Sequence, residues 1–90
     1  TTTALIVAYA LVAGRPILAR TVEIFVAHAQ VDCVAVVIAA GDEDLYRQSV
    51  TLRSDKLLAP IPGDDTRQRS VLCGLRGLAS RKPAKVLIHD

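Results

Sequence analysis

The stretch Val34-Ala-Val-Val-Ile38 is apolar at every position, and it decides the fold class. A strand with one face in water alternates apolar and polar side chains, whereas a strand covered on both faces does not. Strands of the second kind are typical of parallel sheets that carry helices on both sides. We therefore expect a strand over residues 31–40, ended by Gly41, inside a parallel α/β sheet.

Apolar runs and segments of helical period alternate along the rest of the chain. The expected strands cover residues 4–8, 31–40, 56–61 and 85–89. The expected helices cover residues 16–28, 42–50 and 66–79. Pro16 suits the first position of its helix because its missing N–H costs nothing there. This alternation predicts an α/β fold with right-handed crossovers.

The first and last helices each carry apolar side chains that we expect to face the sheet. In the first helix these are Ile17, Leu18, Val22, Ile24 and Phe25. In the last helix they are Val71, Leu72, Leu75, Leu78 and Ala79. Gly74 and Gly77 weaken the last helix by about 1 kcal/mol each relative to alanine, and we expect them to permit close packing on the sheet.

Length and composition exclude several classes of protein. The 90 residues allow a single domain with a small core, and 51% hydrophobic residues are too many for a disordered chain. Aromatic residues make up only 3%, and the basic residues behind the net charge of +2 are scattered, so no nucleic-acid partner is expected. The apolar N-terminal segment is shorter than the roughly 20 residues of a spanning helix and lacks a signal peptide's basic region. A cytoplasmic protein without membrane contact is expected.

The cysteines and histidines do not form a metal-binding pattern. Cys33 and Cys73 stand in separate apolar runs, and we expect both to be buried free thiols in a reducing compartment. His28 and His89 share no metal-ligand spacing with them, so no structural zinc site is expected.

Polar and charged residues gather where the expected strand 56–61 gives way to the expected helix 66–79, in Pro62-Gly-Asp-Asp-Thr-Arg-Gln-Arg-Ser-Val71. In an open α/β sheet, ligands bind at such turns, outside the carboxyl ends of the strands. The N–H groups and dipole of a helix N-terminus suit phosphate. Asp65 or Thr66 is expected to cap the helix. From this segment alone, a ligand site and a solvated, well-capped helix start both remain open.

The first strand is not followed by a turn. Ala8 is joined directly to Tyr9 within an apolar run over residues 4–13, where a nucleotide-binding α/β domain would carry its glycine-rich phosphate loop. Neither a G-x-x-x-x-G-K-[ST] nor a G-x-G-x-x-G pattern occurs in the sequence.

Four segments together resemble the 2-C-methyl-D-erythritol 4-phosphate cytidylyltransferases of the non-mevalonate isoprenoid pathway. They are residues 11–21, residues 31–38, residues 63–71 with Gly74 and Leu75, and residues 86–90. The last two segments, at this spacing, are the specific ones. The first two alone indicate only an α/β domain of the kind that transfers sugar nucleotides.

The resemblance implies a Rossmann-like, mostly parallel α/β fold of nucleotidyltransferase type, of which residues 1–90 are the N-terminal part of a single domain. It implies transfer of a cytidylyl group from CTP to 2-C-methyl-D-erythritol 4-phosphate with release of pyrophosphate, assisted by Mg²⁺ or another divalent cation. It also implies a homodimer, whose dimerising arm belongs to the family's second half. A longer natural chain is therefore expected, and a natural mass near 9.6 kDa would contradict this.

The resemblance also assigns site residues, one by one. The residues expected to bind CTP are Ala8, Gly63, Asp64, Asp65, Arg67 and Ser70. Ser70 would hydrogen-bond the base, and Arg67 would help hold either the nucleotide loop or the phosphates. Asp64 stands where many members have a second glycine. Asp90 would lie near the ribose, the substrate phosphate and Mg²⁺. No catalytic residue is expected in this chain, because the family's Arg/Lys loop would stand between Ala8 and Tyr9.

Two other functions remain open. Related cytidylyltransferases act on ribitol phosphate or other polyol phosphates, and the acceptor pocket that separates them lies in the family's second half. If 90 residues is the natural length, a non-catalytic α/β binding module is the alternative. The sequence does not show whether the natural chain is fused to a cyclase domain.

Overall fold

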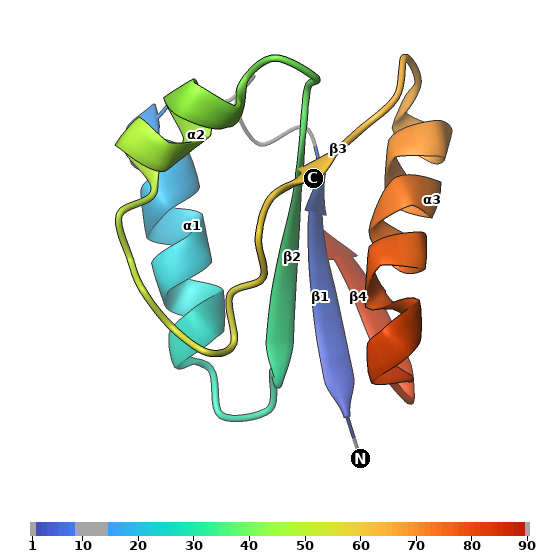
Figure 1. The fold of residues 1–90 in the computed structure, drawn as a ribbon. Helices are drawn as coiled ribbons and strands as arrows, with labels where there is room; N and C mark the ends of the chain where they lie inside the picture. The colour runs from blue at the N-terminus through green and yellow to red at the C-terminus, as the bar shows by residue number, and fades with distance from the viewer. Residues whose placement is uncertain (1, 9–14, 90) are drawn as a thin grey trace.

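The computed structural model describes residues 2–8 and 15–89, which form one four-stranded parallel sheet (Figure 1). Its strands are β1 (Thr3–Ala8), β2 (Cys33–Ile38), β3 (Ile61–Pro62) and β4 (Lys85–His89), in the spatial order β3-β2-β1-β4. Leu5 of β1 lies in register with Val34 of β2 and with Leu87 of β4, both in parallel. The parallel α/β fold expected from the apolar run in β2 is confirmed.

Helices cover both faces of this sheet. Figure 1 shows α1 (Arg15–Ala27) and α2 (Glu43–Ser49) on one face, and α3 (Arg67–Leu78) on the other. A short 3₁₀ helix, η2 (Ala79–Arg81), follows α3. The chain moves in one direction across the sheet from β1 to β2 to β3 and then returns past β1 to β4. Right-handed crossovers therefore place α3 opposite α1 and α2.

The central strands β1 and β2 are buried on both faces. All of β2 is buried, as are residues 4–8 of β1. The core on the α1–α2 face includes Leu5, Val7, Leu18, Val22, Val34, Val36, Ile38 and Tyr46. The core on the α3 face includes Ala4, Ile6, Cys33, Ala35, Val37 and Leu78. Because complete burial of a Val, Leu or Ile side chain contributes about 1.5–3 kcal/mol, these two strands carry most of the stabilising contacts.

Glycines bring α3 close to the sheet, as expected. A Cβ atom on Gly74 would lie 3.1 Å from methyl groups of Ile6 and Val37. A Cβ atom on Gly77 would lie 2.5 Å from Cδ1 of Ile61. The helix backbone therefore rests directly on β1 and β2 at Gly74.

The third strand differs from the expectation. Instead of a continuous strand over 56–61, the structure has an isolated parallel bridge between Leu57 and Val34, and then the two-residue β3. The Leu57 N–H donates to the carbonyl oxygen of Ser54, which forms a turn. Pro60 has no N–H for the ladder. The edge strand is interrupted between the bridge and β3.

The outward faces of the helices also differ from the expectation. The side chains of Ile17, Ile24, Leu72 and Leu75 were expected to face the sheet, but they are 40–59% exposed. In α1 the buried side chains are Leu18 and Val22, with Phe25 half-buried. In α3 the contact with the sheet runs through Val71, Gly74 and Leu78. The apolar stripe of each helix is wider than the face that the narrow sheet covers.

The expected free thiols are confirmed, with one difference in burial. Cys33 is buried in β2, and this burial raises the pKa of its thiol, whereas Cys73 is only partly buried. Within the described part of the chain, no helix has the length and apolar character needed to cross a membrane.

Replacing each of the two glycines of α3 by alanine distinguishes the steric cost of close packing from the gain in helix propensity. We expect Gly74→Ala to lower the free energy of unfolding by about 1–2 kcal/mol, because its Cβ meets two buried side chains. Gly77→Ala is the matched control: its Cβ meets the flexible end of a half-buried isoleucine, and the gain in helix propensity offsets that contact. We expect it to stay within about 0.5 kcal/mol of the wild type. Urea unfolding of the two variants measures both values, and equal effects would contradict close packing at Gly74.

Tyr46 offers a second test of the core. Its hydroxyl is buried and finds no hydrogen-bond partner, and burial raises its pKa from 10.0 to about 12. Because a buried unpaired hydroxyl costs about 1–3 kcal/mol, Tyr46→Phe should raise the free energy of unfolding at pH 7 by about 1 kcal/mol.

The same residue predicts a pH dependence. The unfolded chain releases the tyrosine proton near pH 10, whereas the folded chain holds it to about pH 12. Unfolding is therefore favoured as the pH rises between these values, by up to about 2–3 kcal/mol. Tyr46→Phe should lack this loss, so the stability difference between the two proteins should widen above pH 10. A constant difference would contradict the burial of the hydroxyl.

Candidate functional site

The carboxyl ends of all four strands lie at one edge of the sheet, because the strands are parallel. They are Ala8, Ile38, Pro62 and His89. The chain reverses its direction across the sheet between the neighbouring strands β1 and β4. Such a reversal leaves a crevice outside the carboxyl ends of the two strands, and ligands of open α/β sheets bind there. The topology therefore puts the candidate site at this edge.

The expected site residues lie along this edge as far as the structure describes them. Ala8 is the last residue of β1, and its side chain is fully buried, so a ligand would meet its main chain. Residues 63–65 (segment 63–65) follow β3 directly, and Arg67 and Ser70 lie in the first turn of α3. Asp90 and the join between Ala8 and Tyr9 fall outside the described residues.

Ser70 joins α3 to segment 63–65. Its side chain is 2% exposed, and its hydroxyl accepts a hydrogen bond from the Asp64 N–H at 3.0 Å. The same hydroxyl donates to the Asp64 carbonyl oxygen at 3.1 Å. A Cβ atom on Gly63 would lie only 2.6 Å from Ser70 Oγ. Glycine at position 63 is therefore what allows Ser70 to hold the main chain of segment 63–65.

The main-chain N–H groups of segment 63–65 all donate within the protein. Gly63 donates to the carbonyl oxygen of Ile38 at 2.7 Å, Asp64 donates to Ser70, and Asp65 donates to Asp64 Oδ1 at 2.7 Å. The hydrogen bond from the Asp65 N–H lowers the pKa of the Asp64 carboxyl, which keeps it ionised. Segment 63–65 therefore presents oxygen acceptors and negative charge, which suit a hydrogen-bond donor and oppose phosphate. The N–H groups expected to suit phosphate are those at the start of α3, and that expectation stays a prediction.

The start of α3 is fixed by two further interactions. Thr66, one of the two expected caps, is the N-cap, and its Oγ1 accepts from the Arg69 N–H at 3.2 Å. The Arg69 guanidinium lies 3.2 Å from Asp65 Oδ1. Both side chains of this ion pair are more than 60% exposed, so it contributes only about 0–1 kcal/mol. The ion pair holds Asp65 of segment 63–65 next to the first turn of α3.

Metal-binding side chains do not form a cluster in the described residues. Within residues 2–8 and 15–89, no group of three or more His, Cys, Asp or Glu side chains could hold a metal ion.

Residues 4–90 match the family model of IspD, 2-C-methyl-D-erythritol 4-phosphate cytidylyltransferase. The chain belongs to this family. Curated relatives named bifunctional enzyme IspD/IspF agree with the match. The relative from Mesorhizobium japonicum is 43% identical over 82 residues, covering 91% of this chain and 20% of the relative. The relative from Desulforudis audaxviator is 43% identical over 84 residues, covering 91% of this chain and 21% of the relative.

The chain spans about a fifth of the length of these curated relatives. The observed parallel sheet with helices on both faces is consistent with the Rossmann-like nucleotidyltransferase fold of the family. The family resemblance expected from the sequence is confirmed.

Sequence reasoning missed Arg69 and the role of Gly63. The spacing of Asp65 and Arg69, four residues apart across a helix start, is a signal that could have indicated their ion pair. Nothing in the sequence signals that Gly63 is in contact with Ser70, because this contact depends on how α3 docks on the sheet.

A double-mutant cycle tests the junction between Gly63 and Ser70. Gly63→Ala should lower the free energy of unfolding by about 2 kcal/mol, because the new Cβ collides with Ser70 Oγ and crowds Val37. Ser70→Ala should cost about 1 kcal/mol for its lost hydrogen bonds. With alanine at position 70, Gly63→Ala should cost about 1 kcal/mol less than in the wild type. Additive effects in urea unfolding would show that the two residues are not coupled.

Proposed function

We propose that this chain supplies the CTP-binding wall of an enzyme that transfers a cytidylyl group from CTP to 2-C-methyl-D-erythritol 4-phosphate and releases pyrophosphate. The observation that carries the proposal is the acceptor-only character of segment 63–65 at the carboxyl edge of the sheet. Membership of the cytidylyltransferase family supports it.

The cytosine base fits segment 63–65 by hydrogen-bond complementarity. The exocyclic amine of cytosine donates hydrogen bonds, whereas uracil has a carbonyl oxygen at the same position. Carbonyl and carboxylate oxygens at Gly63, Asp64 and Asp65 accept from an amine and oppose a carbonyl. Ser70 keeps the main chain of this segment in place beside the base.

The rest of the nucleotide extends from this wall toward β4. Three strand spacings, about 14 Å in all, separate β3 from β4 along the edge. Ala8 lies between them, so its main chain borders the ribose and phosphates. Arg67, exposed in the first turn of α3, helps to hold the nucleotide through its positive charge. Asp90 directly follows β4 and would face the ribose and the acceptor's phosphate.

Mg²⁺ fits this proposal as a hard cation that takes oxygen ligands. It is commonly held by one or two carboxylates together with substrate phosphates. The Asp90 carboxylate would supply a protein ligand, and bound Mg²⁺ would neutralise the charge that develops on the phosphates. The described residues bind and orient the nucleotide, and none of them is proposed as catalytic. Membership of the family supports a homodimer in which further chain completes the active site.

Binding selectivity tests the proposed function on the 90-residue chain itself. In isothermal titration calorimetry with Mg²⁺ present, we expect CTP to bind at least tenfold more tightly than UTP. Inorganic triphosphate serves as the control for affinity that does not involve the base. Equal affinity for CTP and UTP, or no binding of CTP, would overturn the proposal.

Pyrophosphate release tests the reaction in the natural protein. With CTP and 2-C-methyl-D-erythritol 4-phosphate, we expect turnover of the order of 1 s⁻¹. Faster turnover with ribitol phosphate would move the assignment to another polyol phosphate. No release, together with tight CTP binding, would indicate a non-catalytic binding module.

A further inference from the structure

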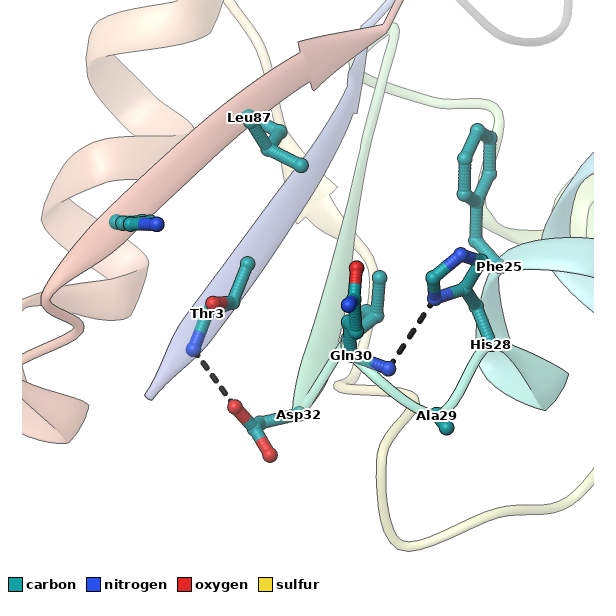
Figure 2. Close-up of a pocket in the computed structure, with 9 residues that line it drawn as sticks. Thr3, Phe25, His28, Ala29, Gln30, Asp32 and Leu87 are labelled. Carbon is teal, nitrogen blue, oxygen red and sulfur yellow. Dashed lines mark hydrogen bonds between the residues drawn. The ribbon is translucent and has the colours of Figure 1, made fainter. Parts of the chain in front are cut away.

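A hollow separates α1 from β4 on the face that α1 covers. It has a volume of about 640 Å³, and its lining includes Thr3, Phe25, Lys85 and Leu87. Figure 2 shows Phe25 and His28, at the end of α1, across the hollow from Thr3 and Leu87 on the strands. Helix α1 therefore does not pack directly on β4 here.

As a result, β4 has little support on this side. It is an edge strand, paired with β1 alone within the described sheet. Leu87, which lines the hollow on this face, is 50% exposed. Val86 packs against the core on the α3 face, so the strand is anchored on that side. Its α1 face needs another contact to hold the carboxyl end of the strand.

The rings of Phe25 and His89 supply this contact. Their centroids are 5.2 Å apart and the planes are inclined by 59°, a tilted arrangement within the favourable range for aromatic pairs. His89 is the last residue of β4 and lies in register with Val7, next to the end of β1. The ring pair therefore ties α1 to the carboxyl end of β4.

We propose that His89 is a positioning residue for nucleotide binding, because its ring packs on Phe25 and fixes the carboxyl end of β4. This inference rests on the proposed function: the strand end that His89 holds is the one from which Asp90 would reach the nucleotide. His89 acts through its packing and does not itself touch the ligand. Its contribution should therefore survive replacement by another ring.

Three variants of the 90-residue chain test this role. His89→Ala removes the ring, His89→Phe keeps a ring, and Ile88→Ala is a matched control on the opposite face of the same strand. We expect His89→Ala to weaken CTP binding about three- to tenfold and to speed amide hydrogen exchange in β4 of the ligand-free protein. His89→Phe should stay within about twofold of the wild type in both measurements, as should Ile88→Ala in CTP affinity.

The two measurements separate this inference from the proposed function. The positioning role alone would be overturned if amide hydrogen exchange in β4 were unchanged in His89→Ala. It would also be overturned if the wild type bound CTP and His89→Ala bound it with the same affinity. Failure of the wild type to bind CTP would overturn the proposed function, and the exchange data would still decide whether His89 fixes the strand end. A loss in His89→Phe equal to that in His89→Ala would show that the imidazole itself contacts the ligand, against the proposal.

Discussion

Burial of the two central strands on both faces is the constraint on which the rest of the structure depends. Neither β1 nor β2 has a side that tolerates water, so helices must cover the sheet from both directions. A chain with right-handed crossovers can do this only by reversing its direction across the sheet. The reversal lies between β1 and β4, and ligands of open α/β sheets bind outside the carboxyl ends of strands at such a point. The candidate site is therefore a consequence of how the core is covered.

A second constraint sets the shape of one wall of that site. Gly74 lets α3 approach β1 and β2 closely, and this fixes the height of the helix above the sheet. At that height, Ser70 in the first turn reaches the main chain of Asp64, and Gly63 leaves room for it. Core packing thus determines which hydrogen-bonding groups segment 63–65 can offer. The stability of the fold and the proposed binding of the nucleotide therefore depend on the same few contacts.

Much of the fold could be predicted from local patterns. The continuous apolar run in β2 indicated burial on both faces, and the alternation of strand and helix signals gave the element order. The prediction of a continuous third strand over residues 56–61 was wrong, because Pro60 and the turn at Ser54 interrupt an otherwise apolar stretch. The prediction that all the apolar side chains of α1 and α3 face the sheet was also wrong. The hydrophobic pattern of a helix does not show how much of its surface a narrow sheet covers. In α3, Gly74 lies at the centre of the buried face, and glycine does not count as hydrophobic in such a pattern. For the site, the resemblance to the cytidylyltransferases assigned the residues, whereas the use of each N–H in segment 63–65 follows only from the docked helix.

The most direct test of the account is a map of amide chemical shifts in the 90-residue chain as CTP is added. The account predicts that the largest changes fall at Ala8, across residues 63–70 and at His89, along the carboxyl edge of the sheet. Changes centred instead on Thr3, Asp32 and Lys85, around the hollow between α1 and β4, would contradict it.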